Sequence, residues 1–403
     1  MPVTALEGVR VLDLTHHIAG PHCTKLLADY GADVIKIERP GTGDPARSMG
    51  PFFHDDPHPE KSALFLHLNT NKQSVTLNLK SSAGRQIARQ LVEKADIVVE
   101  NFAPGVMERF GLDYNQLRQW NPRVVVTSIS NFGQSGPYRD LKSSEIVSLA
   151  MGGPMNNTGH PDREPLKLGG NVVAYHAGSV AAYATMLALY TAEDDGQGQH
   201  VDVSIYETQA GFRDRRVIYL TAYAYTGAVS QRTDPGVRLG SGTKPCADGY
   251  VNIMGGANRF PDICRMIGHP ELADDPRFSN QMARIDPEAA EAFDQYYLPW
   301  LMEHTMRDAV ATAQEHHLPS GAINTVEDLV QEPHYRGRGF WETIDHPYTG
   351  AVEYPGRPFI MSETPRPPAS RAPLLSEHTA DVLHRELGYS QEDLVLLRQQ
   401  RVT

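Results

Sequence analysis

Two side chains that could carry acid–base chemistry, Tyr175 and His176, stand at the start of a long apolar stretch. A phenol and an imidazole can each exchange a proton with a bound molecule. The stretch from 175 to 190 is dense in alanine and is followed by DDGQG, which predicts a helix and its end. Because residues at the start of a buried helix more often pack or form hydrogen bonds, we favour a structural role for both.

A carboxylate side chain is missing from the same segment. Gly169 and Gly170 form a glycine-rich loop ahead of the helix, and no Asp or Glu occurs between Glu164 and Glu193. Covalent catalysis by a carboxylate therefore cannot come from these residues. Elsewhere, HDDPH (His54–His58) contains residue types that bind metals. No helical or strand spacing directs them to one point, so we interpret this stretch as a solvated loop and expect no metal.

The elements around these residues follow the pattern of an α/β protein. Short runs rich in Val and Ile predict buried parallel strands, and helical segments alternate with them. A helix that begins near Pro21 and ends at Gly31 joins the first two strands in a βαβ unit, which implies right-handed crossovers. Ser81 and Ser82 are candidate N-caps of a later helix, and another helix begins near Ser144. The predicted strands are 9–14, 33–39, 74–80, 96–102, 123–130 and 200–207.

The chain changes character after this unit. We expect a doubly wound large domain at 1–215 and a smaller α+β domain at 216–330, with one strand at 250–254. Residues 331–403 are expected to return to the large domain through a Pro-rich linker at 357–373. Two closing helices are predicted at 378–387 and 391–401. No G-x-G-x-x-G follows the first strand, so a dinucleotide site is unsupported.

The composition limits the classes of binding partner and the cellular compartment that we expect. The formal net charge of −12 over 403 residues disfavours nucleic acid as a partner, because phosphate backbones demand clustered Lys and Arg. The three cysteines, Cys23, Cys246 and Cys264, are too few and too widely spaced for a disulfide framework or a zinc site, which indicates the cytoplasm. The N-terminus has no signal-like pattern, and no run of about 18 apolar residues indicates a membrane span.

Six separate stretches resemble, in order, the class III CoA-transferase (CaiB/BaiF) family. This family includes formyl-CoA, carnitine and benzylsuccinate CoA-transferases and the α-methylacyl-CoA racemases. The resemblance covers essentially the whole chain and implies a Rossmann-like large domain, a small domain, an interlocked-ring dimer, and coenzyme A thioesters and a carboxylic acid as substrates. The stretches are LTHHIAGPHCTKLLADYGADVIKIERPGTGD, LNTNKQSVTLNLK, DIVVENFAPGVMERFGLDY, NPRVVVTSISNFGQSGPY, DGQGQHVDVSIYE and APLLSEHTADVLHRELG.

The resemblance also assigns binding positions. In the family the turn after the first strand binds CoA through backbone groups, which here implies Ile18 and Ala19, with His16 matching a family histidine. Backbone N–H groups at such turns suit phosphates. Matches to the family's phosphate contacts are Arg39, Lys80, Arg109 and Lys142. Matches to its adenine and pantetheine walls are Leu77, Asn101, Phe102 and Ala103.

The same resemblance exposes a loss. The family's nucleophile is an aspartate four residues before a glycine, and here that glycine is Gly178 and the earlier position is Ala174. Glu145 matches a carboxylate near the reaction centre, yet we disfavour it as a substitute because a misplacement of about 1 Å can cost roughly 100-fold in rate. Racemisation would lose both of its groups. The small-domain glycine loop is shortened to Gly240-Ser241-Gly242, which favours an acyl group bulkier than formate or oxalate.

Three hypotheses follow from this pattern. The first is a nucleophile-less, CoA-binding subunit of a heteromeric CoA-transferase, paired with a paralogue that carries the aspartate and similar to benzylsuccinate CoA-transferase. The second is a homomeric lyase, hydratase or isomerase acting on an acyl-CoA through His176, Tyr175 or Glu145. The third is an Asp-to-Ala variant of an ordinary CoA-transferase. A fourth hypothesis, a non-enzymatic sensor of CoA esters, is less favoured than these three.

Overall fold

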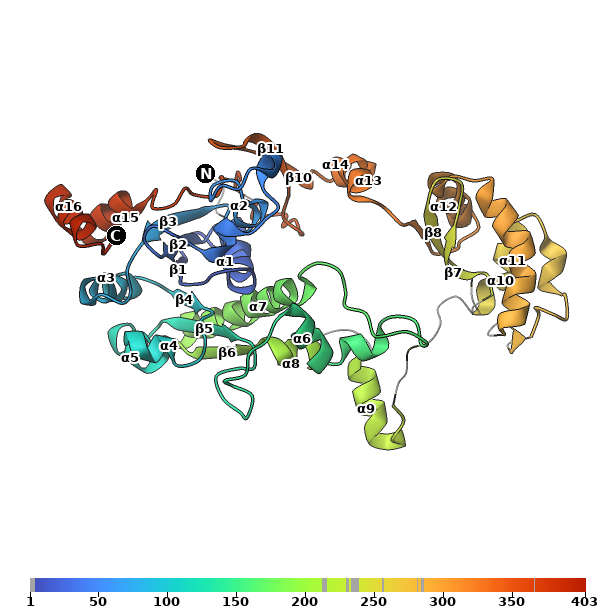
Figure 1. Ribbon diagram of the computed structural model, residues 1–403, viewed down its shortest axis with the longest axis horizontal. Helices are drawn as coiled ribbons and strands as arrows, with labels where there is room; N and C mark the ends of the chain where they lie inside the picture. Colours follow the sequence, from blue (N-terminus) through green and yellow to red (C-terminus); the bar gives the residue numbers. More distant parts are fainter. Residues whose placement is uncertain are drawn as a thin grey trace. The chain divides into compact units, whose positions relative to one another are not determined.

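The structure is a computed structural model that describes residues 4–211, 216–229, 232, 239–255, 257–280, 282–283, 286–365 and 367–403. By its internal contacts the chain forms two compact units. The large unit comprises residues 1–158, 165–230 and 339–403, and the small unit comprises 159–164 and 231–338. Domain boundaries at 215/216 and 330/331 stay predictions. The return of the C-terminal part to the large unit is visible in Figure 1.

The large unit is built on a parallel sheet of six strands in the order β3-β2-β1-β4-β5-β6. This is the strand order of a doubly wound Rossmann-type sheet, in which the order reverses between the first and fourth strands. The predicted α/β class is therefore confirmed. The strands are β1 (Arg10–Asp13), β2 (Asp33–Glu38), β3 (Lys72–Thr76), β4 (Ile97–Glu100), β5 (Val125–Ser130) and β6 (His200–Ser204).

Helices cover both faces of this sheet (Figure 1). Alternate strand residues point to opposite faces, so Val98 and Val126 join one core while Val99 and Val125 join the other. The first core is closed by α3 (Ser82–Val92), α4 (Val106–Phe110), α5 (Tyr114–Trp120), α15 (Thr379–Leu387) and α16 (Gln391–Gln399). The second is closed by α1 (Ala19–Asp29) and α7 (Val172–Asp195). The predicted N-cap is confirmed, since the Ser81 hydroxyl accepts a hydrogen bond from Gly84 N–H at 3.0 Å.

Helix α7 packs closely against α1. Gly178 is buried in this contact, and a Cβ there would lie 2.4 Å from the Ala19 carbonyl oxygen. Ala177 and Ala181 are fully buried on the same side. By length and composition alone α7 could also cross a bilayer, which the sequence survey did not anticipate. It packs beside α1 on one face of the sheet, which explains its buried apolar side. Tyr183, Leu187 and Tyr190 on its other side are exposed.

Some element limits differ from those predicted. β3 leaves the sheet after Thr76, because Asn78 N–H donates to the Val402 carbonyl at 2.7 Å. The expected strand to residue 207 ends at Ser204, whose hydroxyl accepts from Glu207 N–H at 3.3 Å as a helix begins. The sequence did not predict α2 (Ala63–Leu68), α4, α5, α8 (Ile205–Gly211), α9 (Arg216–Thr226) or the antiparallel pair β10 (Trp341–His346) and β11 (Gly350–Pro355). The helix near Ser144 is α6 (Glu145–Met151).

The small unit has its own antiparallel sheet and core. Its sheet has three strands where the sequence indicated one, because the flanking strands are short and contain Gly or Pro. The strands are β7 (Ser241–Pro245), β8 (Tyr250–Met254) and β9 (Ser320–Ala322). The helices are α10 (Phe260–Met266), α11 (Pro287–Met302), α12 (Met306–Glu315), α13 (Val326–Gln331) and α14 (Pro333–Gly337).

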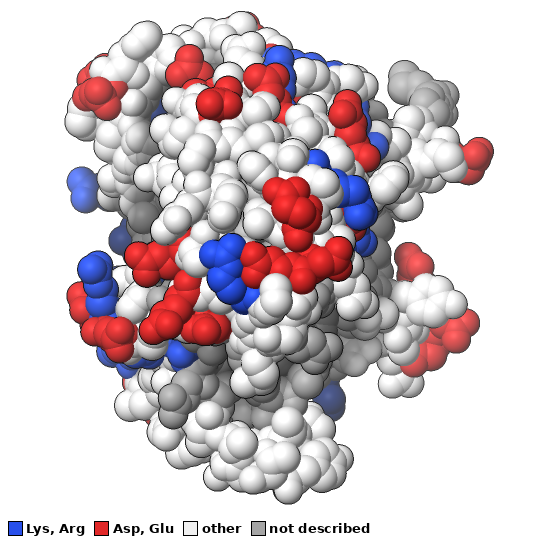
Figure 2. Space-filling view, turned by 90° about the vertical axis from the view of Figure 1, so that its right-hand side faces the viewer, with Lys and Arg blue, Asp and Glu red and all other residues white. Residues whose placement is uncertain are grey.

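In Figure 2, Asp and Glu side chains are spread over the face shown, with Lys and Arg among them, in keeping with the acidic net charge.

Candidate functional site

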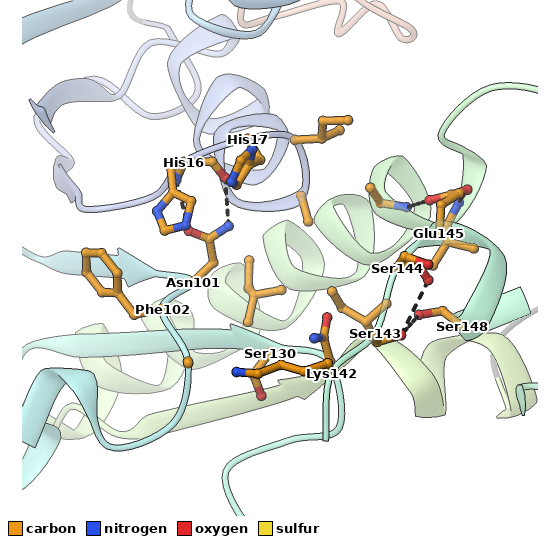
Figure 3. Close-up of a pocket in the computed structure, with 18 of the residues that line it drawn as sticks. His16, His17, Asn101, Phe102, Ser130, Lys142, Ser143, Ser144, Glu145 and Ser148 are labelled. Atoms are coloured by element: carbon orange, nitrogen blue, oxygen red, sulfur yellow. Dashed lines mark hydrogen bonds between the residues drawn. The ribbon is translucent and has the colours of Figure 1, made fainter. Parts of the chain in front are cut away.

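The candidate site lies where the strand order of the large unit reverses, at the carboxyl ends of β1 and β4. Ligands of open α/β sheets bind at such a point because the two following turns diverge there. A side chain joins the turns here: His16 N–H donates to Asn101 Oδ1 at 2.9 Å, and Asn101 Nδ2 donates to the His16 carbonyl at 2.8 Å (Figure 3). The Asn101 side chain, which lies in the turn after β4, therefore holds the backbone of the turn after β1 in place.

Buried charged side chains stabilise the turn after β1. Lys36 Nζ is fully buried, donates to the Thr15 carbonyl at 2.8 Å, and lies 2.9 Å from Asp44 Oδ2. Asp44 Oδ1 in turn accepts from His17 N–H at 3.0 Å. Asp13 accepts from Thr15 N–H at 2.9 Å and pairs with Lys72 at 3.0 Å. The backbone on both sides of His16 is thereby fixed, although His17 adopts the left-handed conformation at φ 67°.

The pKa values in this network follow from its pairing. Burial alone would raise the pKa of Asp13, but Lys36 and Lys72 together with hydrogen bonds from Thr15 and Thr24 hold it far below its usual range. Burial lowers the pKa of His16 to about 4, and the electrostatic interaction with neighbouring His17 acts in the same direction. The His16 imidazole is consequently neutral at physiological pH and can accept or donate one hydrogen bond.

Two contiguous pockets open around these turns. The first, of about 810 Å³, reaches from His16 to the start of α7, and the second, of about 650 Å³, extends over the ends of β2 and β3. His16 and Phe102 line both, so the two form one elongated cleft. Figure 3 shows His16 and Phe102 on one side of the first pocket and Ser144 and Glu145 on the other. Both pockets lie within the large unit.

All of the binding and reaction-centre residues assigned through the family resemblance line this cleft. The first pocket gathers His16, Ile18, Ala19, Asn101, Phe102, Ala103, Arg109, Lys142, Glu145 and Ala174. The second gathers Arg39, Leu77 and Lys80. Their individual roles stay predictions, but the fold brings residues from six separate segments to one surface.

Glu145 caps the helix that contains Ala174. Its carboxylate accepts from Val173 N–H at 2.7 Å and from Ala174 N–H at 3.3 Å. The N-cap residue of α7, Asn171, supplies no side-chain hydrogen bond. The free N–H groups of a helix start favour a negative partner, so Glu145 stabilises the first turn of α7 from another helix. Both of its oxygens are engaged in this contact.

Several cleft residues were missed from the sequence. Arg139 and Ser130 line the first pocket, and Arg401 lines the second. The Ser130 hydroxyl is buried and has no hydrogen-bond partner within the described part of the chain. Arg139 and Ser130 fall in or beside the NPRVVVTSISNFGQSGPY stretch, a signal that could have drawn attention to them. Arg401 had no such signal.

Tyr175 and His176 do not line the cleft. The Tyr175 ring packs edge-on against His22, with ring centres 4.9 Å apart, in the contact between α1 and α7. This agrees with the structural role favoured above. The short glycine loop Gly240-Ser241-Gly242 begins β7 of the small unit. Among the described residues, no group of three or more His, Cys, Asp or Glu side chains could hold a metal ion.

Comparisons with known proteins agree with this architecture. The model of CoA-transferase family III matches residues 6–379. Succinyl-CoA–D-citramalate CoA-transferase of Chloroflexus aurantiacus is 34% identical over 407 residues, which cover 100% of this chain and 98% of the relative. Formyl-CoA:oxalate CoA-transferase of Streptomyces avermitilis is 35% identical over 410 residues, covering 98% of each. The chain therefore belongs to CoA-transferase family III.

Solved structures lead to the same family. A CaiB/BaiF family protein from Brucella suis superposes with a TM-score of 0.84 at 32% identity, covering 95% of this chain and 100% of the other. A further sequence relative, succinate–glutarate CoA-transferase of Agrobacterium fabrum, is 34% identical over 394 residues, which cover 94% of each chain. The protein is thus an enzyme of the CoA-transferase family, in which the relatives named above are CoA-transferases that act on a CoA thioester and a carboxylate.

Proposed function

We propose that this chain binds a CoA thioester along the cleft and takes part in CoA transfer as the nucleophile-less subunit of a heteromeric CoA-transferase. The thioester would lie in the first pocket beside Glu145 and Ala174, and the nucleotide would lie in the second. The neutral His16 and the backbone of Ile18 and Ala19 would contact the chain between them. Cytoplasmic location and an interlocked dimer belong to the same proposal.

CoA binding is supported by the shape and charge of the cleft. CoA is long, apolar in its middle and anionic at its nucleotide end. The cleft is elongated, its two pockets share His16 and Phe102, and the second pocket carries Arg39 and Lys80. Arg and Lys recognise phosphate through charge-assisted hydrogen bonds. An acidic protein with a cationic pocket at this place is expected to bind a phosphorylated ligand there.

The observation that carries the subunit assignment is that the carboxylates around Ala174 are poorly placed to act as a nucleophile. The carboxylates that line the first pocket are Asp140, in the exposed loop before Lys142, and Glu145. Attack on a thioester requires a free carboxylate oxygen within reach of the carbonyl carbon. Glu145 is bound to the start of α7, and using it would leave N–H groups of that helix without a partner. A second chain that supplies the aspartate resolves this conflict.

The CoA acceptor is proposed to be a dicarboxylic acid. Oxalate, citramalate, succinate and glutarate, which the names of the relatives contain, are all dicarboxylates. One carboxylate of such a substrate would receive CoA. The other would find Arg139 in the same pocket, beside Arg109 and Lys142, which the family resemblance assigns to CoA phosphates.

Native mass spectrometry of the complex from its source tests the subunit assignment. We expect an equal share of a second chain of similar size. A complex of two identical chains would refute the heteromer. Turnover of an acyl-CoA by the lone chain that is abolished in Glu145→Ala would instead establish a homomeric enzyme that uses this carboxylate.

A gain-of-function variant tests the site itself. In the lone chain, Ala174→Asp should create CoA transfer between an acyl-CoA and a dicarboxylic acid, because it restores a carboxylate at the start of α7. Ala174→Asn is the matched control, since it has the same shape without a nucleophilic oxygen. Equal activity of both variants would contradict the placement of the reaction at position 174.

A further inference from the structure

The chain segment after α16 returns to the cleft and places Arg401 in its second pocket. Helix α16 ends in a hydrogen-bond pattern in which Arg401 N–H donates to the Arg398 carbonyl at 3.0 Å and Val402 N–H donates to the Leu397 carbonyl at 2.9 Å. This is the Schellman motif, and buried Val402 and Leu397 supply its apolar contact. Asn78, from the loop after β3, binds the Val402 carbonyl and fixes this end to the pocket.

The conformation of Arg401 is unusual for its residue type. Its φ is 55°, the left-handed region that the residue after a helix C-cap adopts in this motif. Glycine is strongly preferred at that position, because a Cβ there meets the following carbonyl. An arginine therefore costs stability at this place, and a benefit from its side chain would offset that cost.

The second pocket has cations without protein partners. Within the described residues, the side chains of Arg39, Lys80 and Arg401 form no hydrogen bond or ion pair with the protein. The side-chain carboxylates that line the pocket are already paired: Glu38 with Arg47 at 2.8 Å and Asp44 with Lys36 at 2.9 Å. Among the described side chains, the unpaired charge that lines the pocket is consequently positive.

We infer that Arg401 is a further substrate-binding residue that contacts a phosphate at the nucleotide end of CoA together with Arg39 and Lys80. The inference rests on the proposed function. The thiol and the nucleotide occupy opposite ends of CoA, so a thioester at Ala174 places the nucleotide beyond His16, in the second pocket. A guanidinium there can bind phosphate with two parallel N–H donors, which a lysine cannot do.

Isothermal titration with CoA and with adenosine 3′,5′-bisphosphate, a probe of the nucleotide end alone, tests the inference. The variants are Arg401→Gln, Arg401→Gly and the matched control Arg398→Gln, which removes an exposed charge three residues earlier on α16 and outside the pocket. We expect both Arg401 variants to raise the Kd of each probe about tenfold, the loss of one charge-assisted contact. Arg398→Gln should stay within about twofold of the wild type.

Two results would overturn the inference. One is an unchanged Kd for both probes in Arg401→Gln. The other is an equal loss in Arg398→Gln, which would reduce the effect to general charge. Arg401→Gly separates binding from folding, because glycine suits φ 55° and should leave the melting temperature unchanged or higher while affinity falls. A wild-type protein that binds neither probe would refute the proposed CoA binding itself.

Discussion

Glu100 should make the stability of this protein fall as the pH rises toward 7. The residue ends β4, directly before the Asn101 turn, and is 3% exposed. One of its carboxylate oxygens accepts from Phe102 N–H at 2.8 Å, and Ser128, which bonds to His200 at 2.9 Å, is its other hydrogen-bond partner. Burial raises the pKa of Glu100 to about 7, these hydrogen bonds oppose the rise, and the charges of Glu108 and Asp202 add to it.

The sign and size follow from proton linkage. The folded pKa of Glu100, about 7, lies above its usual value of 4.5. The folded state therefore holds this proton more tightly, and the stability it contributes is complete below pH 4.5 and lost as the pH rises through 7. One pKa unit corresponds to about 1.4 kcal/mol, so the loss approaches roughly 3 kcal/mol, of which most falls between pH 5 and pH 8.

Glu100→Gln should remove this dependence, because the amide is neutral at every pH and still accepts from Phe102 N–H. The free energy of unfolding, measured by urea denaturation from pH 5 to pH 8, should favour the variant increasingly, by about 2–3 kcal/mol over this range. Glu315→Gln is the control, since Glu315 is exposed on α12 and is not among the charges that act on Glu100, so the difference from the wild type should stay flat. Parallel curves for wild type and Glu100→Gln would refute the reasoning.

Two further variants test the start of α7. Gly178→Ala should lower the free energy of unfolding by about 1–3 kcal/mol, because its Cβ would lie 2.4 Å from the Ala19 carbonyl oxygen. Gly169→Ala is the control and should change the free energy of unfolding little, because the space around Gly169 is open. Equal effects of the two substitutions would contradict the close contact at Gly178. Glu145→Ala should cost about 1–2 kcal/mol as the loss of a helix cap. Glu145→Gln should recover part of this in thermal denaturation, because its amide oxygen still accepts, and no recovery would argue against capping.

The sequence by itself determined the sheet and most of the helices that cover it. Central parallel strands are buried on both faces, so β4 and β5 contain short runs of Val and Ile rather than an alternation with charged residues, as in VVVTSIS. The cap at Ser81 is a local signal, because its hydroxyl bonds to a backbone group three residues later. The matching stretches contain most of the predicted cleft residues, and the family pattern between them supplied Lys142, Glu145 and Ala174.

Only the tertiary structure decided how the cleft is completed. Nothing in the local sequence around Arg401 indicates that it reaches the loop after β3, because that contact joins opposite ends of the chain through Asn78 and Val402. The same holds for Glu145, whose carboxylate caps a helix in a different segment. Local patterns record what a residue does for its own helix or strand. Contacts between distant segments depend on the packing of the whole unit, and they decided which charges face the cleft.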